Sequence, residues 1–475
     1  MFRATLRRAL LCAAALFAPH AVQADTTALR VEPYAFRLAD GTDLPAERGT
    51  FTVPEDRSDP HSRRIEIGFV RFRSTNPHPG APIVYLAGGP GGSGVGTAQG
   101  PRQPVFLALR AVADVIALDQ RGTGLSNHIP PCAAARPLDP GLVLSEATLT
   151  AYYRETLRDC LGRWRAAGVA ADGYTTAESA DDIADLRAAL GVPRVDLWAI
   201  SYGTHLAMAA MRRHPDSIGR VAMASVEGMD QTVKLPAHVD AAFARIGAVA
   251  GGDLVGTMRR VHARMDSEPL AFTVASTDGA GVTYRADSFP IRMMAGFIAK
   301  NPNGIGQLVQ GYGALDAGVT APLAPLLWRF FYAEPLTMTG MTELMDGASG
   351  ITDARLALIR QQTPSSLLGM AVNFPMPQLR GAVPGLDLGD DFRREICADH
   401  PVLIFSGDLD VRTPLEEQAV ATAGLTHAQR ILFRNGGHDL FEAHPDVAAI
   451  LTDFFSGRPV TTRELVLPSP ILRPR

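Results

Sequence analysis

The chain has 475 residues, of which 46% are hydrophobic and 20% charged, and its formal net charge at pH 7 is −4. This size and composition suit a globular protein with a large core, built as two or three domains or as one domain with an insertion. No block of basic residues is present, so we expect neither nucleic acid nor an anionic membrane surface as a partner.

The first 24 residues, "MFRATLRRALLCAAALFAPHAVQA", have the three-part layout of a secretory signal peptide. Arginines come first, an apolar run from Ala9 to Phe17 follows, and small residues precede an expected cleavage before Asp25. The alternative is a membrane anchor, but the apolar run is shorter than the roughly 18 residues of a spanning helix. We expect export to the periplasm or the medium, without stable membrane insertion.

Three cysteines remain once the signal is removed, namely Cys132, Cys160 and Cys397. In an exported protein we expect the first two, 28 residues apart, to form a disulfide that leaves Cys397 outside it. The alternative is three buried thiols.

The first half of the chain alternates between strand and helix patterns. Residues 63–74 alternate apolar and polar side chains, which predicts an antiparallel strand or hairpin. Residues 175–191 begin with Thr and Ser, carry acids in the first turn and end in glycine, which predicts a helix. Short apolar runs typical of buried strands lie at 82–88, 113–119, 194–200 and 218–228.

The second half changes character and then returns to the first pattern. Residues 231–389 are rich in Met, Gly and Pro and indicate mostly helices and loops. Strands are predicted again at 400–408 and 430–438, followed by a helix at 444–457. The Pro-rich tail beyond residue 458 is expected to be a surface strap.

Interrupted strand–helix alternation predicts an α/β fold, with a mostly parallel, doubly wound sheet and an inserted, mainly helical cap. The expected divisions are a signal peptide at 1–24, the first part of the core at 25–230, the cap at 231–389 and the second part of the core at 390–475.

The stretch "LWAISYGTHLA" (197–207) predicts a strand that breaks sharply into a helix, with Ser201 at the break. In α/β hydrolases such a serine is the nucleophile, usually within G-x-S-x-G, and the acid and histidine follow it in chain order. Here Ala199 replaces the first glycine, whereas Gly203 keeps the second. The alternative is a serine that merely occupies a tight turn.

A serine hydroxyl needs a base and a group that orients the base. An acid follows the strand "VLIFSG", either Asp408 or Asp410, and His438 follows the strand "RILFRNGG". Asp408 directly follows its strand and can bond its own turn backbone, a common role for aspartate, so we favour Asp410. The alternative for His438 is a histidine that caps a helix.

An oxyanion hole is expected from the N–H of Tyr202 and a second N–H in the loop "LAGGPGGSG" (86–94). Gly89 is the first choice for that donor and Gly88 the second, because glycines allow close backbone approach. The alternative, a phosphate cradle, lacks the Gly-Lys-Ser/Thr ending of such loops.

With these motifs in order, the chain resembles the proline iminopeptidase and tripeptidyl aminopeptidase family of α/β-hydrolase serine peptidases. The resemblance rests on "GGPGG" (88–92), "DQRGTGLS" (119–126), "YTTAESADDIADLRAALG" (174–191), "ISYGT" (200–204), "GDLDVRTP" (407–414) and "GGH" (436–438). It implies a triad of Ser201, Asp410 and His438, and the family's cysteines near Cys132 and Cys160 agree with the expected disulfide.

Substrate recognition departs from the family pattern. The resemblance implies that acids bind the substrate ammonium, and Glu227 and Asp230 stand where the family usually has acids. The family's later cluster of cysteine and acid is missing, because residues 369–379 contain Asn373 and no carboxylate.

The leading hypothesis is an exported serine hydrolase, an aminopeptidase that releases N-terminal residues from short peptides through an acyl-enzyme on Ser201. The second is an esterase or amidase that acts on small apolar esters or amides, since serine acyl transfer serves both. The third is a non-catalytic binding protein of the same fold. No metal or organic cofactor is implied, and the oligomeric state is not predicted.

Overall fold

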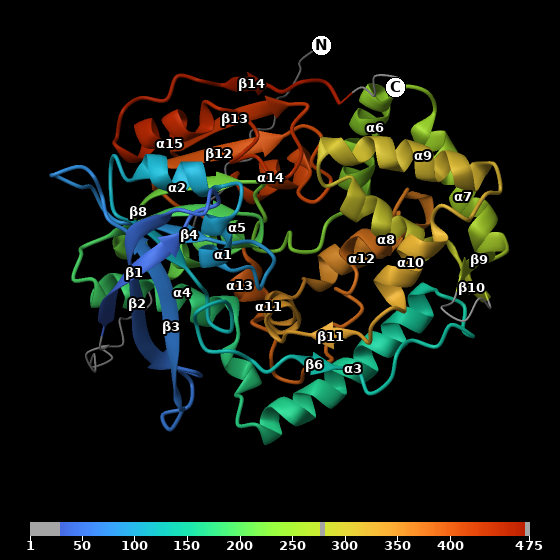
Figure 1. The fold of residues 1–475 in the computed structure, drawn as a ribbon, viewed down its shortest axis with the longest axis horizontal. Coiled ribbons are helices and arrows are strands. Elements are labelled where there is room, and N and C mark those ends of the chain that lie inside the picture. The colour runs from blue at the N-terminus through green and yellow to red at the C-terminus, as the bar shows by residue number, and fades with distance from the viewer. Residues whose placement is uncertain (1–28, 276–280, 471–475) are drawn as a thin grey trace, which may run out of the picture.

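The computed structural model describes residues 29–275 and 281–470, so the predicted signal peptide lies outside the described residues. Its centre is a ten-stranded sheet with the strand order β1-β2-β3-β5-β4-β7-β8-β12-β13-β14 (Figure 1). Strands β1 (Arg30–Arg37), β2 (Asp43–Pro54) and β3 (Arg64–Phe72) are antiparallel, and β3 also pairs antiparallel with β5 (Val115–Leu118).

All further strand pairs of this sheet are parallel, which confirms the predicted mostly parallel α/β sheet. These strands are β4 (Ile83–Leu86), β7 (Val195–Ile200), β8 (Ile218–Ala224), β12 (Val402–Gly407), β13 (Ala428–Arg434) and β14 (Glu464–Val466). The tail differs from the expected strap, because β14 extends the sheet by pairing with β13. Strand β14 has only three residues, too few to show an alternating pattern in the sequence.

Apolar side chains of the central strands alternate between two buried layers. On β7, Leu197 and Ala199 face the layer that contains α4 and α5, whereas Trp198 and Ile200 face the layer that contains α2 and α15. The helices that form these layers are α1 (Gly94–Gln99), α2 (Gln103–Leu109), α4 (Thr176–Ala189), α5 (Tyr202–Arg213) and α15 (Val447–Phe455). Helix α4 begins where predicted, since the Thr175 side chain accepts the Glu178 N–H.

The chain between β8 and β12 folds mainly into helices; the buried side chains of residues 341–359 pack into a cluster of the sheet, whereas most of the other helices, to the right of the sheet in Figure 1, share a buried cluster of their own. The elements are α6 (Pro236–Ala250), α7 (Leu254–Ser267), α8 (Ser288–Ile298), α9 (Ile305–Asp316), α10 (Ala324–Phe331), α11 (Met341–Ser349), α12 (Asp353–Gln362) and α13 (Gly389–Arg393). A hairpin of β9 (Leu270–Ala275) and β10 (Gly281–Ala286) interrupts the helices. Leu138, Leu144 and Leu149 join this cluster from a segment earlier in the chain than β8.

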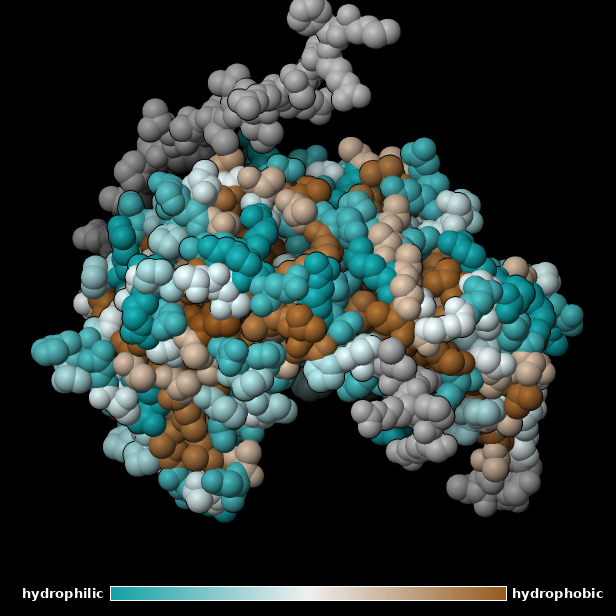
Figure 2. Space-filling model, turned by 90° about the horizontal axis from the view of Figure 1, so that it is seen from above, coloured by the Kyte–Doolittle hydropathy of each residue, from teal (hydrophilic) through white to brown (hydrophobic). Residues whose placement is uncertain are grey.

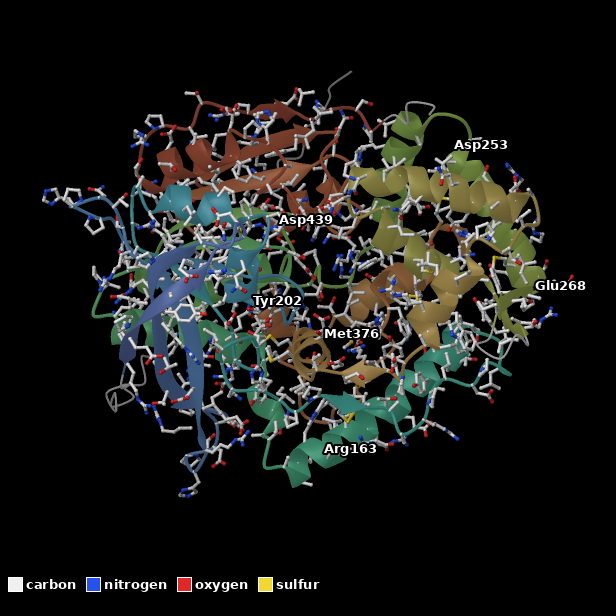
Figure 3. All side chains as sticks on the ribbon, viewed as in Figure 1. Arg163, Tyr202, Asp253, Glu268, Met376 and Asp439 are labelled. Carbon is white, nitrogen blue, oxygen red and sulfur yellow. A yellow bond between two sulfur atoms is a disulfide. The ribbon has the colours of Figure 1, made fainter. Side chains whose placement is uncertain are left out.

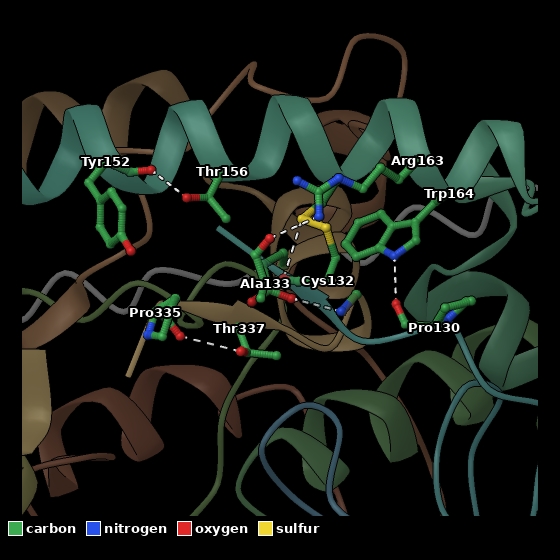
Figure 4. The surroundings of a disulfide bond; sticks show 12 residues. Pro130, Cys132, Ala133, Tyr152, Thr156, Arg163, Trp164, Pro335 and Thr337 are labelled. Atoms are coloured by element: carbon green, nitrogen blue, oxygen red, sulfur yellow. Dashed lines mark hydrogen bonds between the residues drawn. A yellow bond between two sulfur atoms is a disulfide. The ribbon is translucent and has the colours of Figure 1, made fainter. Parts of the chain in front are cut away.

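The predicted disulfide between Cys132 and Cys160 is present, with a Cα–Cα distance of 5.7 Å (Figure 4). It joins β6 (Cys132–Ala133) to α3 (Glu146–Ala166), and β6 pairs with β11 (Thr337–Met338) just before α11. The disulfide thus lies within the part of the chain before β8, and the pairing of β6 with β11 joins this part to the helical insertion. Cys397 is exposed and lies outside the bridge.

The face shown in Figure 2 carries apolar patches toward its middle, bordered by polar side chains. Phe297 and Phe330, on α8 and α10, are among the large hydrophobic side chains that the structure exposes. Within residues 29–275 and 281–470, no helix combines the length and apolar character needed to cross a membrane.

Candidate active site

Ser201 lies at a sharp turn between β7 and α5, with backbone angles φ 54° and ψ −129°. A positive φ is strained for a residue with a side chain, and such strain is characteristic of a nucleophile elbow. A Cβ on Gly203 would lie only 2.2 Å from the Leu86 carbonyl oxygen, so that position requires glycine. Ala199 is fully buried in the sheet, where its methyl group is accommodated.

The Asp410 carboxylate, in the loop after β12, lies 2.9 Å from Nδ1 of His438, which follows β13. It also accepts bonds from the N–H groups of Arg412 and Thr413 at 2.8 and 3.0 Å and from the Thr413 hydroxyl at 2.6 Å. Burial raises the pKa of Asp410, but the imidazole and the Thr413 donors outweigh it and hold that pKa below its ordinary value. The carboxylate therefore stays ionised beside His438.

Asp408, the alternative acid, has different surroundings. Its carboxylate lies 3.8 Å from the guanidinium of Arg434, and its backbone N–H donates to the Phe433 carbonyl at 3.2 Å. Burial raises the pKa of Asp408, opposite to the direction at Asp410. The geometry thus brings Asp410, and not Asp408, to the histidine.

The backbone of His438 is held on both sides. Its carbonyl accepts the Ser225 hydroxyl at 2.6 Å, and its N–H donates to the Lys300 carbonyl at 2.9 Å and to Asn301 Oδ1 at 3.0 Å. Sequence reasoning missed these three residues. Ser225 ends the β8 run, and Lys300 and Asn301 lie in the helical insertion, so no local pattern relates them to a histidine more than 130 positions later.

The glycine loop after β4 borders the serine. A Cβ on Gly88 would lie 3.0 Å from the Ser201 Cβ and 3.6 Å from its Oγ, and Gly89 has φ +125°. The Gln120 amide donates to the Ala87 carbonyl at 3.0 Å, which fixes the start of the loop.

Figure 3 shows Tyr202 near the middle of the molecule, whereas Asp253 and Glu268 lie at the outer edge of the insertion.

The two acids expected to bind an amine both have partners within the chain. Glu227 is buried, and its carboxylate lies 3.0 Å from Lys234 Nζ. The Asp230 carboxylate accepts the N–H and the hydroxyl of Thr352 at 3.0 and 2.7 Å. Glu227 is nevertheless next to the elbow, because the Thr204 hydroxyl accepts its N–H at 2.8 Å and donates to the Ser201 carbonyl at 2.7 Å.

A further carboxylate of the insertion lies close to Glu227. Burial and the charge of Glu227 raise the pKa of Asp346, on α11, to about 8.

Among residues 29–275 and 281–470, no group of three or more His, Cys, Asp or Glu side chains is arranged to hold a metal ion.

Ser201, Asp410, His438 and the glycine loop each follow a parallel strand and therefore lie toward the same carboxyl edge of the sheet. This arrangement is that of the α/β hydrolases. The chain belongs to the alpha/beta hydrolase fold family, whose model matches residues 81–445.

Two curated relatives carry a more specific name. The chain is 29% identical over 197 residues to a tripeptidyl aminopeptidase of Streptomyces lividans, and 28% identical over 197 residues to one of Streptomyces coelicolor. Each alignment covers 38% of this chain and only 35% of the relative. Among solved structures, an epoxide hydrolase from an endophytic Streptomyces is 18% identical, with a TM-score of 0.41 over 88% of this chain and 99% of that one.

Proposed function

We propose that the chain is an exported serine hydrolase that releases N-terminal residues from short peptides through an acyl-enzyme on Ser201. The observation that carries this proposal is the 2.9 Å bond between Asp410 and His438, together with the positive φ of Ser201. An orienting acid and a base are what turn a serine hydroxyl into a nucleophile.

In the proposed reaction, His438 Nε2 takes the proton of Ser201 Oγ as that oxygen attacks the scissile carbonyl carbon. The buried, ionised Asp410 fixes the imidazole through Nδ1 and stabilises its protonated form. The N–H groups of Tyr202 and Gly89, or Gly88 in place of Gly89, stabilise the oxyanion. The imidazolium then protonates the leaving amine, and water releases the acyl group by the same steps in reverse.

The peptidase assignment is supported by the relatives named tripeptidyl aminopeptidase, although the match covers only part of each chain. Glu227 and Asp230 are the proposed partners of the substrate ammonium. The position of Glu227 beside the elbow supports this role, since its backbone and that of Ser201 share the Thr204 hydroxyl.

Export is proposed from the signal-like residues 1–24, and the disulfide between Cys132 and Cys160 supports it, because such bonds persist in oxidising compartments. The cap is proposed to span 231–389, between core segments 25–230 and 390–475.

A second candidate is an esterase or amidase for small apolar substrates. It is favoured by the Lys234 ammonium, which already lies 3.0 Å from Glu227, and by the absence of a carboxylate from 369–379. A cation in the expected ammonium position weakens the attraction for a substrate amine.

The deciding experiment uses residues 25–475 with a panel of aminoacyl-coumarin amides, each with a free or an acetylated N-terminus, and matching esters. The peptidase proposal predicts cleavage of the free-amine substrates alone. Ser201→Ala is the blank, and Ser217→Ala, another serine of the core, is the matched control expected to cleave at the wild-type rate.

If acetylation makes no difference, or only esters are hydrolysed, the esterase candidate replaces the peptidase. If neither amides nor esters are cleaved and a fluorophosphonate leaves Ser201 unlabelled, the chain is a binding protein of this fold.

A further inference from the structure

A segment of the helical insertion forms hydrogen bonds with the backbone of His438, the proposed base. Lys300 and Asn301 lie between α8 and α9, and both accept the N–H of His438, at 2.9 and 3.0 Å. Asn301 Oδ1 also accepts the Asp439 N–H at 3.1 Å, while Asn301 Nδ2 donates to the Asp439 carboxylate at 2.7 Å. One amide side chain thus makes three bonds to two successive residues.

The contact is close and leaves no room for a side chain. A Cβ on Gly437 would lie 2.7 Å from the Lys300 carbonyl oxygen and 2.8 Å from the Asn301 Cα. The Asp439 carboxylate is also 2.9 Å from Lys300 Nζ. Burial raises the pKa of Asp439, but the bonds to Asn301 and Lys300 outweigh it and hold that pKa below its ordinary value, so the carboxylate is a charged anchor.

The carbonyl oxygen and Nδ1 of His438 are held by the core. Ser225 donates to its carbonyl at 2.6 Å, and Asp410 lies 2.9 Å from Nδ1. The core also holds the following turn, because Arg102 binds Glu442 at 2.9 and 3.0 Å. The N–H of His438 is therefore the side of the residue that depends on the insertion.

We propose that Asn301 is a positioning residue, which places the imidazole of His438 for proton transfer. The position of the imidazole then depends on how the cap lies against the core. The inference rests on the proposed function of Ser201 and His438. A shift of about 1 Å in a reacting group can lower the rate about 100-fold. Hydrogen bonds that hold the backbone of His438 can therefore affect the reaction rate.

A purely structural role for Asn301 predicts a different outcome. In that case removal of the Asn301 side chain would lower the stability of the fold, as loss of any buried hydrogen bond does, and would not change the rate of the chemical step. The rate at which a fluorophosphonate labels Ser201 separates the two, because it reports serine activation without any assumption about the natural substrate.

The test compares Asn301→Ala, Asn301→Asp, Asp439→Asn and the exchange of Asn301→Asp with Asp439→Asn. Asn301→Ala is expected to lower both the labelling rate and kcat 10- to 100-fold, with KM changed less than threefold. Asn301→Asp keeps the acceptor for both N–H groups but sets two carboxylates side by side, so it is expected to be as slow. The exchange restores an amide donor opposite a carboxylate and should return to within threefold of wild type.

Asp240→Ala is the matched control, because the Asp240 carboxylate also accepts a backbone N–H within the insertion, from Leu367 at 2.9 Å. It is expected to lower stability and to keep the wild-type labelling rate. If Asn301→Ala labels as fast as wild type, or if the exchange is no faster than Asn301→Asp alone, the positioning role is wrong and the proposed function stands. A wild-type protein that is not labelled at Ser201 overturns both.

Discussion

Ser201 is surrounded by positions where a side chain would interfere. Gly203 allows α5 to pass the Leu86 carbonyl, and Gly88 brings the loop after β4 within contact of the serine. These close approaches explain why the second glycine of G-x-S-x-G is kept while the first can be alanine, since Ala199 points into the sheet layer beside α5. Backbone packing therefore limits which residues can stand around Ser201.

The neighbouring aspartates provide a sharp test of the proposed acid. Asp410→Asn leaves a similar shape but can present an N–H to His438 Nδ1 in place of an acceptor, which favours the wrong tautomer. We expect kcat to fall roughly 10³- to 10⁴-fold. Asp408→Asn, the matched control, should stay within threefold of wild type. Equal losses in steady-state kinetics would contradict the assignment of Asp410.

The pairing of Asp410 with His438 and the glycine loop beside Ser201 could be predicted because each follows a recognisable strand within a short motif. Gly88 and Ser201 are indeed in contact, and Asp410 rather than Asp408 reaches His438. Ser225 and Asn301 could not be predicted, because their bonds to His438 join parts of the chain that only the tertiary structure brings together.

At the scale of elements, the buried apolar runs of the sequence predict the parallel strands, and the residues typical of a helix start and a helix end predict α4. The edges of the sheet were harder to predict. Strand β1 is mostly exposed and β14 has three residues, so neither has the alternation that marks a half-buried strand. The hairpin of β9 and β10 was missed within a region that otherwise forms helices.

Strand β7 contains an irregularity at a buried acid. Its register with β8 shifts between Val195 and Leu197, and the Asp196 carboxylate accepts the Arg220 N–H at 2.7 Å. Asp196 is 5% exposed, and burial raises its pKa to about 7. The folded protein thus keeps a proton that the unfolded chain releases, so this group lowers the stability progressively as the pH rises from about 4 to about 7.

Asp196→Asn removes this titration and keeps an acceptor for the Arg220 N–H. We expect the free energy of unfolding to rise by roughly 1–3 kcal/mol at pH 8 and by about a third of that at pH 5, with activity unchanged. Urea unfolding at the two pH values measures the difference. Asp391→Asn, on exposed α13, should change stability by less than about 0.5 kcal/mol at either pH. A gain at Asp196 that does not depend on pH would contradict the raised pKa.

At the scale of the whole molecule, the insertion contacts the core through helices α11 and α12 and through the segment between α8 and α9. Thr342 on α11 donates to the Pro90 carbonyl of the glycine loop at 2.9 Å, and Asn301 reaches the histidine loop. Arg355 on α12 binds Glu417 on α14 (Leu415–Ala421) at 2.7 Å. The insertion therefore contacts both the glycine loop after β4 and the loop that carries His438.

The proposed function depends most directly on Ser201 as the nucleophile. The measurement is reaction with a fluorophosphonate, followed by peptide mapping by mass spectrometry and by assay of the residual hydrolysis. We expect a single adduct on Ser201, loss of hydrolysis in proportion to labelling, and neither labelling nor hydrolysis in Ser201→Ala. An adduct on another residue, or full hydrolysis after complete labelling of Ser201, would contradict the account.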